Sequence, residues 1–488
     1  MFLYLKSRRH TLLSKSLVLL FFSLFCNGAT AGVEDLIDVG QSQEQSAVLS
    51  FIEEETINAA TGFTRPTFSS SGNVFVLTKE EIRQAQIRSL VDIFRLVPGL
   101  DVFHNSSDGF NLAANGLGSQ FCNLLLVLMD GAPVITVRYG ETPWSGLPVS
   151  PEDIERVEVV LGPGTSLYGE NAFSGVIDII TRTPESRSKN GGELNLTKGS
   201  LGFGRANFRA NSNSSKASLS IRGGTEVSDG LTQRSQLPGI ADKQSSTLDE
   251  RQQWIDVSYK RQLDKYRSLD LELAFSESLS GGRDVLDGKA QNGDNRLFFG
   301  VTRYTEQINP EQEFRLRVNV MNKRDSKKTG PGADEESVYA DPYSEELVDL
   351  DLRKLVDYRK LRSIFGASFR GKKGHGQPLD GRHEADTRSI YYQAEYDFDD
   401  NWSSFASLRL FDHSITDRDS SWKFDLRRRL GEREIVRIGS GTAIRFPDLS
   451  NLYLLPTENL DGVPLSTPPP CEPRRFGKRG NPLHYLGL

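Results

Sequence analysis

The glycine series Gly162, Gly164 and Gly169 has the spacing of a loop that could bind phosphate. Such a loop needs a strand before the glycines and a helix after them, so that backbone N–H groups and the helix dipole face the anion. Here the segment Phe173–Gly175 leads into another apolar strand, and the loop lacks a Gly-Lys-Ser/Thr sequence. We therefore expect no nucleotide site at these glycines.

The sequence also has no recognisable cluster of residues for metal binding or for acid–base catalysis. The histidines that follow the N-terminal segment are His104, His375, His383, His413 and His484. None of them pairs with another His or Cys at the spacing that a zinc site requires. Acidic residues are plentiful, as at 332–336 and 397–400, but none forms a pair that marks a general acid and base. The sequence predicts no enzyme, no cofactor and no bound metal.

The N-terminus has the three parts of a secretory signal peptide. Basic residues at positions 6, 8, 9 and 15 precede the apolar run Leu17–Cys26, and Ala29-Thr30-Ala31 supplies a cleavage site. The apolar run is too short to span a bilayer. We expect the mature chain to start at Gly32. The alternative, a lipoprotein signal ending at Cys26, places the bulky Phe25 where a small residue belongs.

Charge and hydropathy exclude two other classes of protein. Cleavage removes four positive charges, so the formal net charge falls from −6 to −10. An acidic mature chain does not resemble a nucleic-acid-binding protein. No later stretch approaches the ~20 consecutive apolar residues of a membrane helix, so a membrane location would require a barrel. The two remaining cysteines, Cys122 and Cys471, are far apart and are predicted to be unpaired.

The elements around the glycines predict a compact, turn-rich sheet. Three apolar runs each end at a turn signal or a threonine: Leu124–Leu128, Val157–Leu161 and Val176–Ile180. Upstream, Val74–Leu77 is a predicted strand. Thr78 and Glu81 then form a capping box that opens a helix through about Ala85.

A second capped helical segment follows the first. Ser89 is a predicted N-cap for Leu90–Leu96, and Pro98-Gly99 ends that segment.

From Gly191 onward, apolar and polar residues alternate in short runs. These runs include 217–221, 269–275, 314–320, 392–398 and 406–410. Each run places apolar side chains on one face of a strand and polar side chains on the other. A soluble β-sandwich would give the same alternation. The signal peptide and the long polar insertions favour a transmembrane barrel with long extracellular loops, predicted at 225–251, 281–295 and 324–343.

The segment from Leu124 to Thr183 resembles the plug domain of TonB-dependent outer-membrane receptors. The family pattern has a DG turn, an EDIERIEV segment, and a Gly-Pro-Gly-x-x-x-Tyr-Gly block before a Gly-Val-Ile-x-Ile strand. This sequence has the same features in the same order, at Asp130-Gly131, Glu152–Val159, Gly162-Pro163-Gly164, Tyr168-Gly169 and Gly175–Ile179. So many ordered matches within one segment argue against chance.

The resemblance implies a mostly β fold, in which a small α+β plug domain is followed by an antiparallel transmembrane β-barrel. We expect five regions: a signal peptide at 1–31, a flexible N-terminal extension at 32–63, the plug at 64–186, a partial barrel at 187–455 and an atypical tail at 456–488. The implied location is the outer membrane of the cell, in contact with its lipid.

The extension contains a segment similar to a TonB box, at Glu55, Thr56, Ile57, Asn58 and Ala59. In the family this segment adds as a strand to TonB, which is part of an energising complex in the inner membrane. Strand addition gives affinity through main-chain hydrogen bonds and permits pulling without a deep pocket. An ordinary linker is the alternative interpretation.

The implied function is active uptake of a scarce ligand. His104, Asn105 and Asp108 lie in a segment where the family's plug loops face the ligand, so they are candidates for ligand binding; a solvated loop is the alternative. The family takes up ferric siderophores, haem, cobalamin and oligosaccharides. Family frequency alone makes a ferric siderophore or a similar metal chelate the expected ligand.

The sequence departs from the family at two plug arginines. The positions that align with them are Asn115, before Gly116, and Leu161, before Gly162. In the family these arginines pair with barrel glutamates, and a buried carboxylate without its partner costs several kcal/mol. We expect either changed barrel partners or looser docking of the plug, with Glu395 as a candidate orphaned carboxylate.

The chain is also short for the family, whose barrels have ~22 strands. The residues after the plug suffice for roughly 12–14 strands. Gly480–Leu488 shows neither an alternating strand nor a terminal aromatic residue. The resulting hypothesis is a truncated or frame-shifted receptor. Two alternatives to a working receptor remain, namely a non-transporting remnant and a soluble β-sandwich binding protein.

Overall fold

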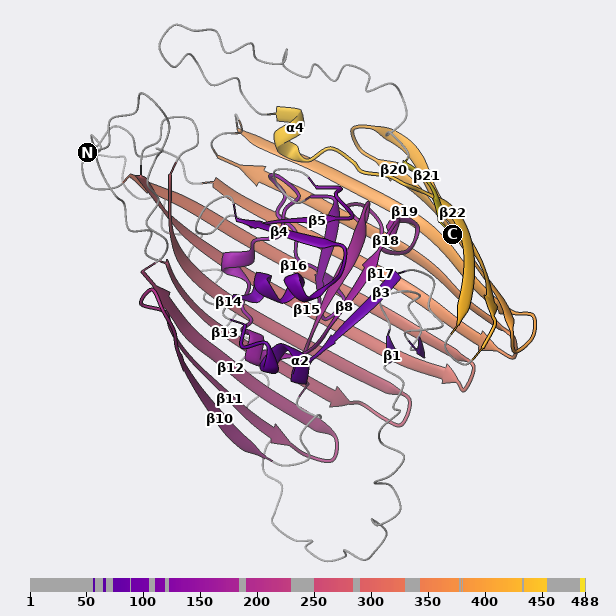
Figure 1. Cartoon of the computed structure of the whole chain (residues 1–488), viewed down its shortest axis with the longest axis horizontal. Coiled ribbons are helices and arrows are strands. Elements are labelled where there is room, and N and C mark those ends of the chain that lie inside the picture. Colours follow the sequence, from indigo (N-terminus) through magenta and orange to yellow (C-terminus); the bar gives the residue numbers. More distant parts are fainter. Residues whose placement is uncertain are drawn as a thin grey trace, which may run out of the picture. The chain divides into compact units, whose positions relative to one another are not determined.

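The computed structural model describes residues 56–57, 65–66, 73–87, 89–104, 110–118, 123–183, 190–229, 250–283, 290–329, 343–376, 379, 381–431, 434–453 and 483–487. All of them belong to one compact unit, Glu54–Leu488. Within this unit we call the small mixed domain of residues 73–183 the plug and the large antiparallel sheet β10–β23 the wall (Figure 1).

The plug is built on a five-stranded sheet with the strand order β3-β8-β9-β6-β7. Its strands are β3 (Asn73–Thr78), β6 (Leu125–Met129), β7 (Ala132–Pro133), β8 (Ile154–Leu161) and β9 (Gly175–Thr181). Strands β6 and β9 are parallel, and the other neighbours are antiparallel. The three predicted apolar runs therefore form adjacent strands, and their side chains build the buried core of the plug.

Short helical segments and two small strand pairs complete the plug and the residues before it. They are α2 (Lys79–Gln84), η4 (Leu90–Leu96), η5 (Trp144–Gly146), η6 (Pro151–Asp153), α3 (Thr165–Tyr168), the pair β4 (Leu100–His104) and β5 (Phe110–Ala114), and the pair β1 (Thr56–Ile57) and β2 (Arg65–Pro66). None of the helices in the described ranges is both long enough and apolar enough to cross a bilayer.

The predicted helix caps are present. The Thr78 side chain accepts a hydrogen bond from the backbone N–H of Glu81, and the Glu81 carboxylate accepts one from the backbone N–H of Thr78 at 2.8 Å. Ser89 caps the next segment through the N–H of Val91, but that segment is a 3₁₀-helix. Both caps satisfy N–H groups that have no partner within the helix.

The expectation that no helix follows the glycine loop was wrong at one point. A single helical turn, α3, begins directly after Gly164. It has four residues and no side-chain cap, and the chain then returns to strand β9. A periodicity argument misses such an element because one turn contains too few residues to repeat.

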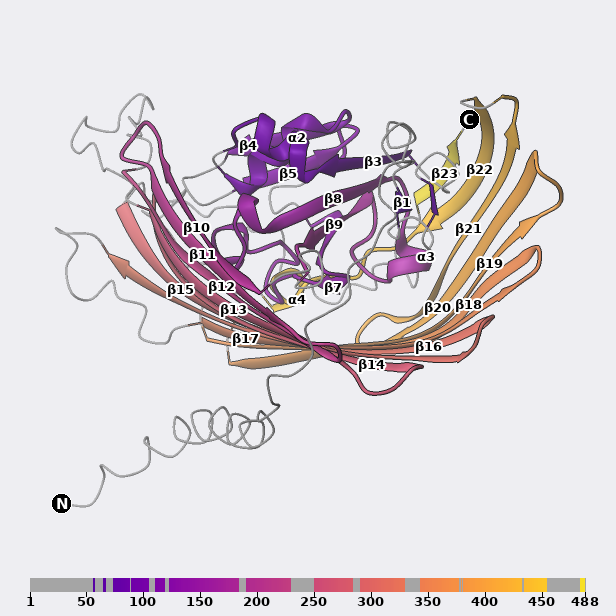
Figure 2. The same ribbon diagram turned by 90° about the horizontal axis from the view of Figure 1, so that it is seen from below.

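The wall is a fourteen-stranded antiparallel sheet in which every strand pairs with its neighbours in sequence. Its strands are β10 (Gly191–Lys198), β11 (Gly204–Asn213), β12 (Ala217–Ser228), β13 (Glu250–Gln262), β14 (Arg267–Arg283), β15 (Ala290–Asn309), β16 (Gln312–Thr329), β17 (Tyr343–Tyr358), β18 (Leu361–His375), β19 (Arg382–Asp397), β20 (Trp402–His413), β21 (Asp417–Arg429), β22 (Ile435–Ala443) and β23 (Leu483–Gly487). Figure 2 shows this sheet curving around the plug. A short helix, α4 (Leu449–Tyr453), contacts β19.

Two predictions about the wall were wrong in detail. Strands β14 and β15 extend through most of 281–295, which was expected to be a loop. The segment Leu483–Gly487 forms a strand, although no strand was expected in Gly480–Leu488. Both cases have the same cause: the backbone of a neighbouring strand supplies hydrogen bonds whatever the local pattern of side chains. No pairing between β10 and β23 occurs among the described residues.

Side chains of the wall have an inside-out distribution. On β14, Glu272 and Ser276 are buried beside the plug, whereas Leu273 and Phe275 are 49% and 44% exposed on the opposite face. Other strands repeat this pattern, with Ile390 61% exposed. A soluble β-sandwich buries its apolar face, so this distribution contradicts that alternative and fits strands that face lipid.

The connections between wall strands differ at the two ends of the sheet. One end has turns of two to five residues, for example between β15 and β16 and between β17 and β18. The other end has the long insertions after β12 and β16. We call these ends the short-turn end and the long-loop end. In outer-membrane barrels short turns face the periplasm.

Ile390, in the middle of β19, tests which face of the wall meets lipid. Ile390→Arg should destabilise the folded chain in lipid vesicles by about 2–4 kcal/mol, because a guanidinium is costly near the bilayer midplane. The measurement is urea unfolding in vesicles, with Ile390→Val as the control. A soluble sheet would tolerate the arginine within about 0.5 kcal/mol, and that result would contradict the lipid-facing assignment.

Candidate functional site: the plug–wall interface

The predicted DG turn is a tight turn between β6 and β7. Asp130 and Gly131 both have positive φ, at 50° and 75°, which is the geometry of a type I′ turn and explains the glycine. The Asp130 carboxylate accepts hydrogen bonds from the Thr181 backbone N–H at 2.8 Å and from its hydroxyl at 2.7 Å. The turn is therefore fixed to the end of β9.

Wall arginines hold the DG turn by its carbonyl groups. Arg303 on β15 donates to the carbonyl oxygen of Asp130 at 2.8 Å, and Arg317 on β16 donates to that of Gly131. Both arginines also pair with wall carboxylates, Arg303 with Glu272 at 3.3 Å and Arg317 with Asp349 at 2.9 Å. The turn thus docks on wall cations that are already neutralised.

The remaining plug-motif residues form the α3 region. Gly162, Pro163 and Gly164 lead into α3, and Gly169 ends it with a φ of 86°. A Cβ atom at Gly169 would lie 2.9 Å from a guanidinium nitrogen of Arg409 on β20, and the positive φ of this residue favours glycine. The same guanidinium donates to the carbonyl oxygen of Leu167 at 2.8 Å. These glycines therefore shape a docking turn rather than a phosphate site.

Glu170 is the principal plug carboxylate in this region, and the sequence analysis did not single it out. Its oxygens lie 2.9 Å from Lys372 Nζ and 3.3 Å from Arg370, and they accept a hydrogen bond from the Thr387 hydroxyl at 3.1 Å. Burial alone would raise the pKa of Glu170, but Lys372 and Arg370 lower it to about 2. Glu170 is thus an anion held by wall cations, and the only sequence signal was an acid inside a glycine-rich apolar block.

A second set of contacts holds the opposite side of the plug to β11. Arg209 pairs with Asp153 at 3.1 Å and donates to the carbonyl oxygen of Arg182 at 2.8 Å. Asn207 donates to the Ser150 hydroxyl at 2.8 Å. This side is also where the plug continues covalently into the wall, between β9 and β10.

The predicted orphaned carboxylate is not orphaned. Glu395 is fully buried, but it pairs with Arg427 and, at 3.4 Å, with Arg362, both on the wall. Leu161 lies in the apolar core of the plug. Asn115 lies in a turn that is closed by the Leu117 N–H donating to the Ala114 carbonyl at 2.9 Å, and its own N–H donates to the Gly99 carbonyl at 2.8 Å. The wall itself supplies the cationic partners of Glu395, so this buried carboxylate does not depend on a plug arginine.

The predicted TonB-box residues and the predicted ligand-binding residues are described only in part. Thr56 and Ile57 form β1, which pairs antiparallel with β2, while Glu55, Asn58 and Ala59 lie outside the described residues. His104 is the last residue of β4 and is paired with Phe110 across the hairpin. Asn105 and Asp108 also lie outside the described residues. The TonB-box and ligand assignments stay predictions.

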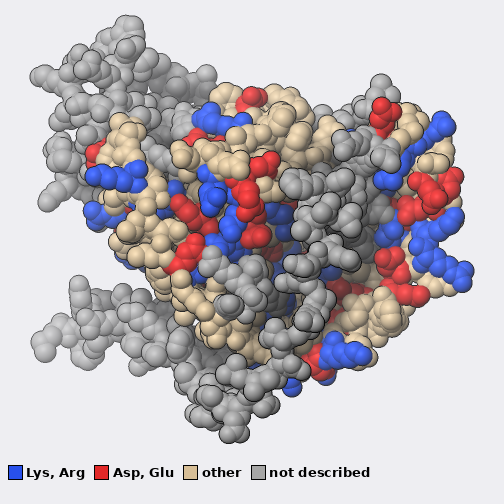
Figure 3. All heavy atoms as spheres, turned by 60° about the horizontal axis from the view of Figure 1, so that its bottom comes forward, with Lys and Arg blue, Asp and Glu red and all other residues tan. Residues whose placement is uncertain are grey.

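Charged side chains are not confined to the interface. Figure 3 shows acidic and basic groups intermixed on the face that it presents, without a large region of one sign. Among the described residues, no group of three or more His, Cys, Asp or Glu side chains could hold a metal ion.

Known proteins are similar to this chain in the plug and in the wall. Residues 66–176 match the TonB-dependent receptor plug domain. A vitamin B12 transporter of Vibrio vulnificus is 26% identical over 425 residues, which is 82% of this chain and 64% of that protein. A ferric enterobactin receptor of Pseudomonas aeruginosa is 29% identical over 178 residues, 34% of this chain and 24% of that protein.

Solved structures share the fold. The crystal structure of a siderophore receptor from Acinetobacter baumannii superimposes with a TM-score of 0.64 at 17% identity, covering 78% of this chain and 62% of that one. Residues 66–176 thus match the plug domain of TonB-dependent receptors, and the chain shares its fold with a solved siderophore receptor and 26% sequence identity with a vitamin B12 transporter. The chain spans 64% or less of the length of the two curated relatives.

One plug carboxylate has a pKa that makes stability depend on pH. Asp178 on β9 is buried, lies directly across from Glu158 on β8, and accepts a hydrogen bond from the Gly131 N–H at 3.0 Å. Burial first, and then the Glu158 carboxylate, raise the pKa of Asp178 to about 7. The folded state therefore binds an extra proton between about pH 4 and pH 7, so its free energy of unfolding falls as the pH rises through that range.

Asp178→Asn should remove this pH dependence, because the amide oxygen can still accept from Gly131 and carries no charge. Above about pH 7 the variant should be more stable than the parent, by at most about 4 kcal/mol. Urea unfolding over this pH range measures the effect, and Asp101→Asn, at an exposed plug position, is the control. Equal pH slopes for parent and Asp178→Asn would show that Asp178 is not the titrating group.

Proposed function

We propose that this chain acts as a TonB-dependent receptor that takes up a scarce ligand across the outer membrane. The observation that carries the proposal is the polar character of the plug–wall interface, in which wall side chains such as Arg303 and Arg409 bind plug carbonyl groups. Hydrogen bonds to backbone can be exchanged for hydrogen bonds to water at a small net cost. A plug held in this way can be released and seated again.

The partner that would release the plug is TonB, with its inner-membrane energising complex. The segment Glu55–Ala59 is the proposed contact. Thr56 and Ile57 pair with Arg65 and Pro66 as a two-residue ladder, so part of the segment already has the extended backbone that strand addition needs. The implied role is mechanical, and no covalent chemistry is assigned to any residue.

The proposed ligand is a ferric siderophore or a similar metal chelate. The two curated relatives carry the names of a vitamin B12 transporter and a ferric enterobactin receptor, and both of those ligands are large polar metal complexes. His104, Asn105 and Asp108 are the proposed ligand contacts on the plug. The alternative function is a non-transporting remnant, in which the plug is present but no closed barrel forms.

Heat-modifiable migration separates a receptor from a remnant. A closed barrel resists detergent without boiling, because each backbone polar group in the bilayer has a partner. We therefore expect the chain in outer-membrane fractions to migrate differently on gels before and after boiling. A known boil-sensitive barrel from the same membranes serves as the positive control. A chain that migrates identically in both states would support the remnant.

Ligand binding by the purified chain tests the class of ligand. Ferric enterobactin should bind saturably, and His104→Ala should weaken its affinity about tenfold, equivalent to ~1.4 kcal/mol. Ser106→Ala, in the same segment, is the matched control. Fluorescence quenching gives both dissociation constants, with cyanocobalamin as the competing probe. Binding of cyanocobalamin alone would replace the siderophore assignment by a cobalamin one.

A further inference from the structure

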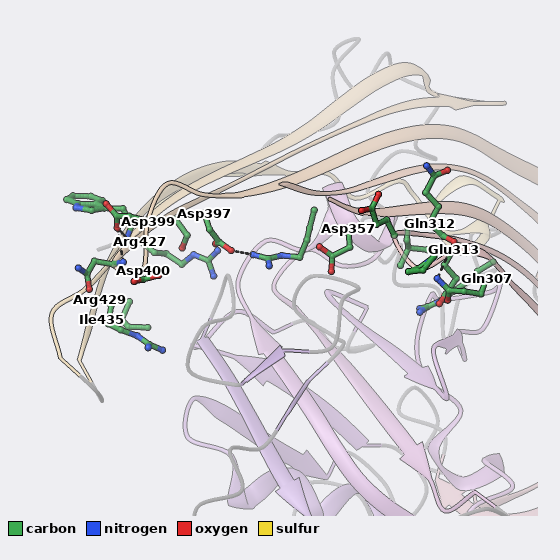
Figure 4. A pocket seen from close by; sticks show the side chains of 18 residues that line it. Gln307, Gln312, Glu313, Asp357, Asp397, Asp399, Asp400, Arg427, Arg429 and Ile435 are labelled. Atoms are coloured by element: carbon green, nitrogen blue, oxygen red, sulfur yellow. Dashed lines mark hydrogen bonds and ion pairs between the residues drawn. The ribbon is translucent and has the colours of Figure 1, made fainter. Parts of the chain in front are cut away.

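A cavity of about 740 Å³ lies at the short-turn end of the wall, and its lining residues all belong to wall strands and their turns (Figure 4). Side chains from β15 to β22 line it, and they include six carboxylates and four guanidinium groups. Several charges are paired with each other: Arg362 contacts Asp397, and the Asp399 carboxylate accepts from the Asn401 and Trp402 N–H groups, each at 2.8 Å. The cavity is polar, and its carboxylates outnumber its guanidinium groups by two.

A second, much smaller cavity of about 20 Å³ lies further along the same wall strands. The plug contributes Leu128, Gly131 and Pro133 around the DG turn, and Tyr168, Gly169 and Glu170 at the end of α3, to its lining. On β17 the inward-facing positions Asp351 and Arg353 line the small cavity, and the next two, Leu355 and Asp357, line the large one. Because alternate residues of a strand are ~7 Å apart, the two cavities are neighbours along β17.

An apolar rung separates the two cavities. Leu355, Ile364 and Tyr391 form a buried cluster on three adjacent wall strands. The Tyr391 hydroxyl donates to Asp351 at 2.8 Å, and the Arg409 guanidinium lies 3.9 Å from the centre of the Tyr391 ring. Arg409 also holds the end of α3, so the rung and the plug share one wall side chain.

The plug closes the route between the cavities only by non-covalent contacts. Glu170 binds Lys372 and Arg370, and the Ser166 hydroxyl lies 2.7 Å from that of Ser407 on β20. On the opposite side, the plug is tied to β11 by Arg209 and is joined covalently to β10. A pull on the plug can therefore release the α3 side while the β11 side stays attached.

We propose that the transported solute passes along wall strands β17–β20, past Tyr391, into the cavity at the short-turn end, and that Thr165–Glu170 is the latch that closes this route. The proposal rests on the receptor function proposed above. A lining with charges of both signs fits a large, polar metal chelate. Glu170 is the central residue of the latch, because it is the plug carboxylate that meets two wall cations there.

Opening the latch should make the outer membrane permeable to large solutes. This effect can be measured even though the ligand has not been identified. Glu170→Gln keeps the size of the side chain but removes the charge that Lys372 and Arg370 meet. Cells producing this variant should become several-fold more sensitive to vancomycin, which is too large for general porins. Asp101→Asn removes a carboxylate at an exposed plug position and should leave sensitivity unchanged. Equal sensitisation by both variants, or none by either, would overturn the proposal.

A disulfide lock tests the position of the latch in the same assay. In Glu170→Gln cells that also carry Cys122→Ser and Cys471→Ser, Ser166→Cys with Ser407→Cys should form a bridge, since the two side-chain oxygens are 2.7 Å apart. Oxidation should restore vancomycin resistance, and a reductant should remove it. The matched pair Ser150→Cys with Asn207→Cys should form a bridge without restoring resistance. Restoration by both pairs would show that the route is not on the α3 side.

The failure of the latch proposal can be told apart from failure of the receptor function. Each variant is first checked for heat-modifiable migration, which reports a folded barrel whatever the latch does. A chain that lacks this migration contradicts the receptor function. A heat-modifiable Glu170→Gln variant that leaves the membrane tight contradicts the latch alone.

Discussion

The constraint on which the structure depends is the burial of polar side chains on the inner face of the wall. A sheet that turns apolar residues such as Ile390 toward lipid must turn its charged residues inward. Buried charges are stable only when they are paired and hydrogen-bonded. The plug supplies many of those partners through its turns, and wall residues such as Arg362 and Glu395 supply the rest for each other.

The plug docks largely through carbonyl groups and carboxylates that contact wall cations, and one plug cation, Arg182, pairs with the wall carboxylate Glu193 at 3.2 Å. Neither Asn115 nor Leu161 supplies a cation to this interface. Wall arginines can supply the cations instead, because a guanidinium that already has a carboxylate partner can donate its remaining N–H groups to backbone oxygens. Arg303 and Arg317 both do so at the DG turn. Docking is therefore intact although both plug arginines are missing.

Much of the local structure was predictable from neighbouring residues. The capping box of Thr78, the DG turn and the alternating strands each depend on short-range patterns, and each is present. The single turn α3 and the last strand β23 were missed, because one turn is too short to show a period and β23 depends on pairing with β22. Glu170 was missed because its partners lie some 200 positions away.

The sequence by itself determined the plug motif, most of the strands and the positions of the tight turns, because periodicity and turn chemistry are properties of adjacent residues. It left open whether the alternating strands buried their apolar or their polar face. Only the tertiary structure decided that question, since the plug's position defines which face is inside. It also decided which charges pair. Glu395 forms an ion pair with a wall arginine and Glu170 forms one with Lys372, because the sheet brings distant strands to one surface.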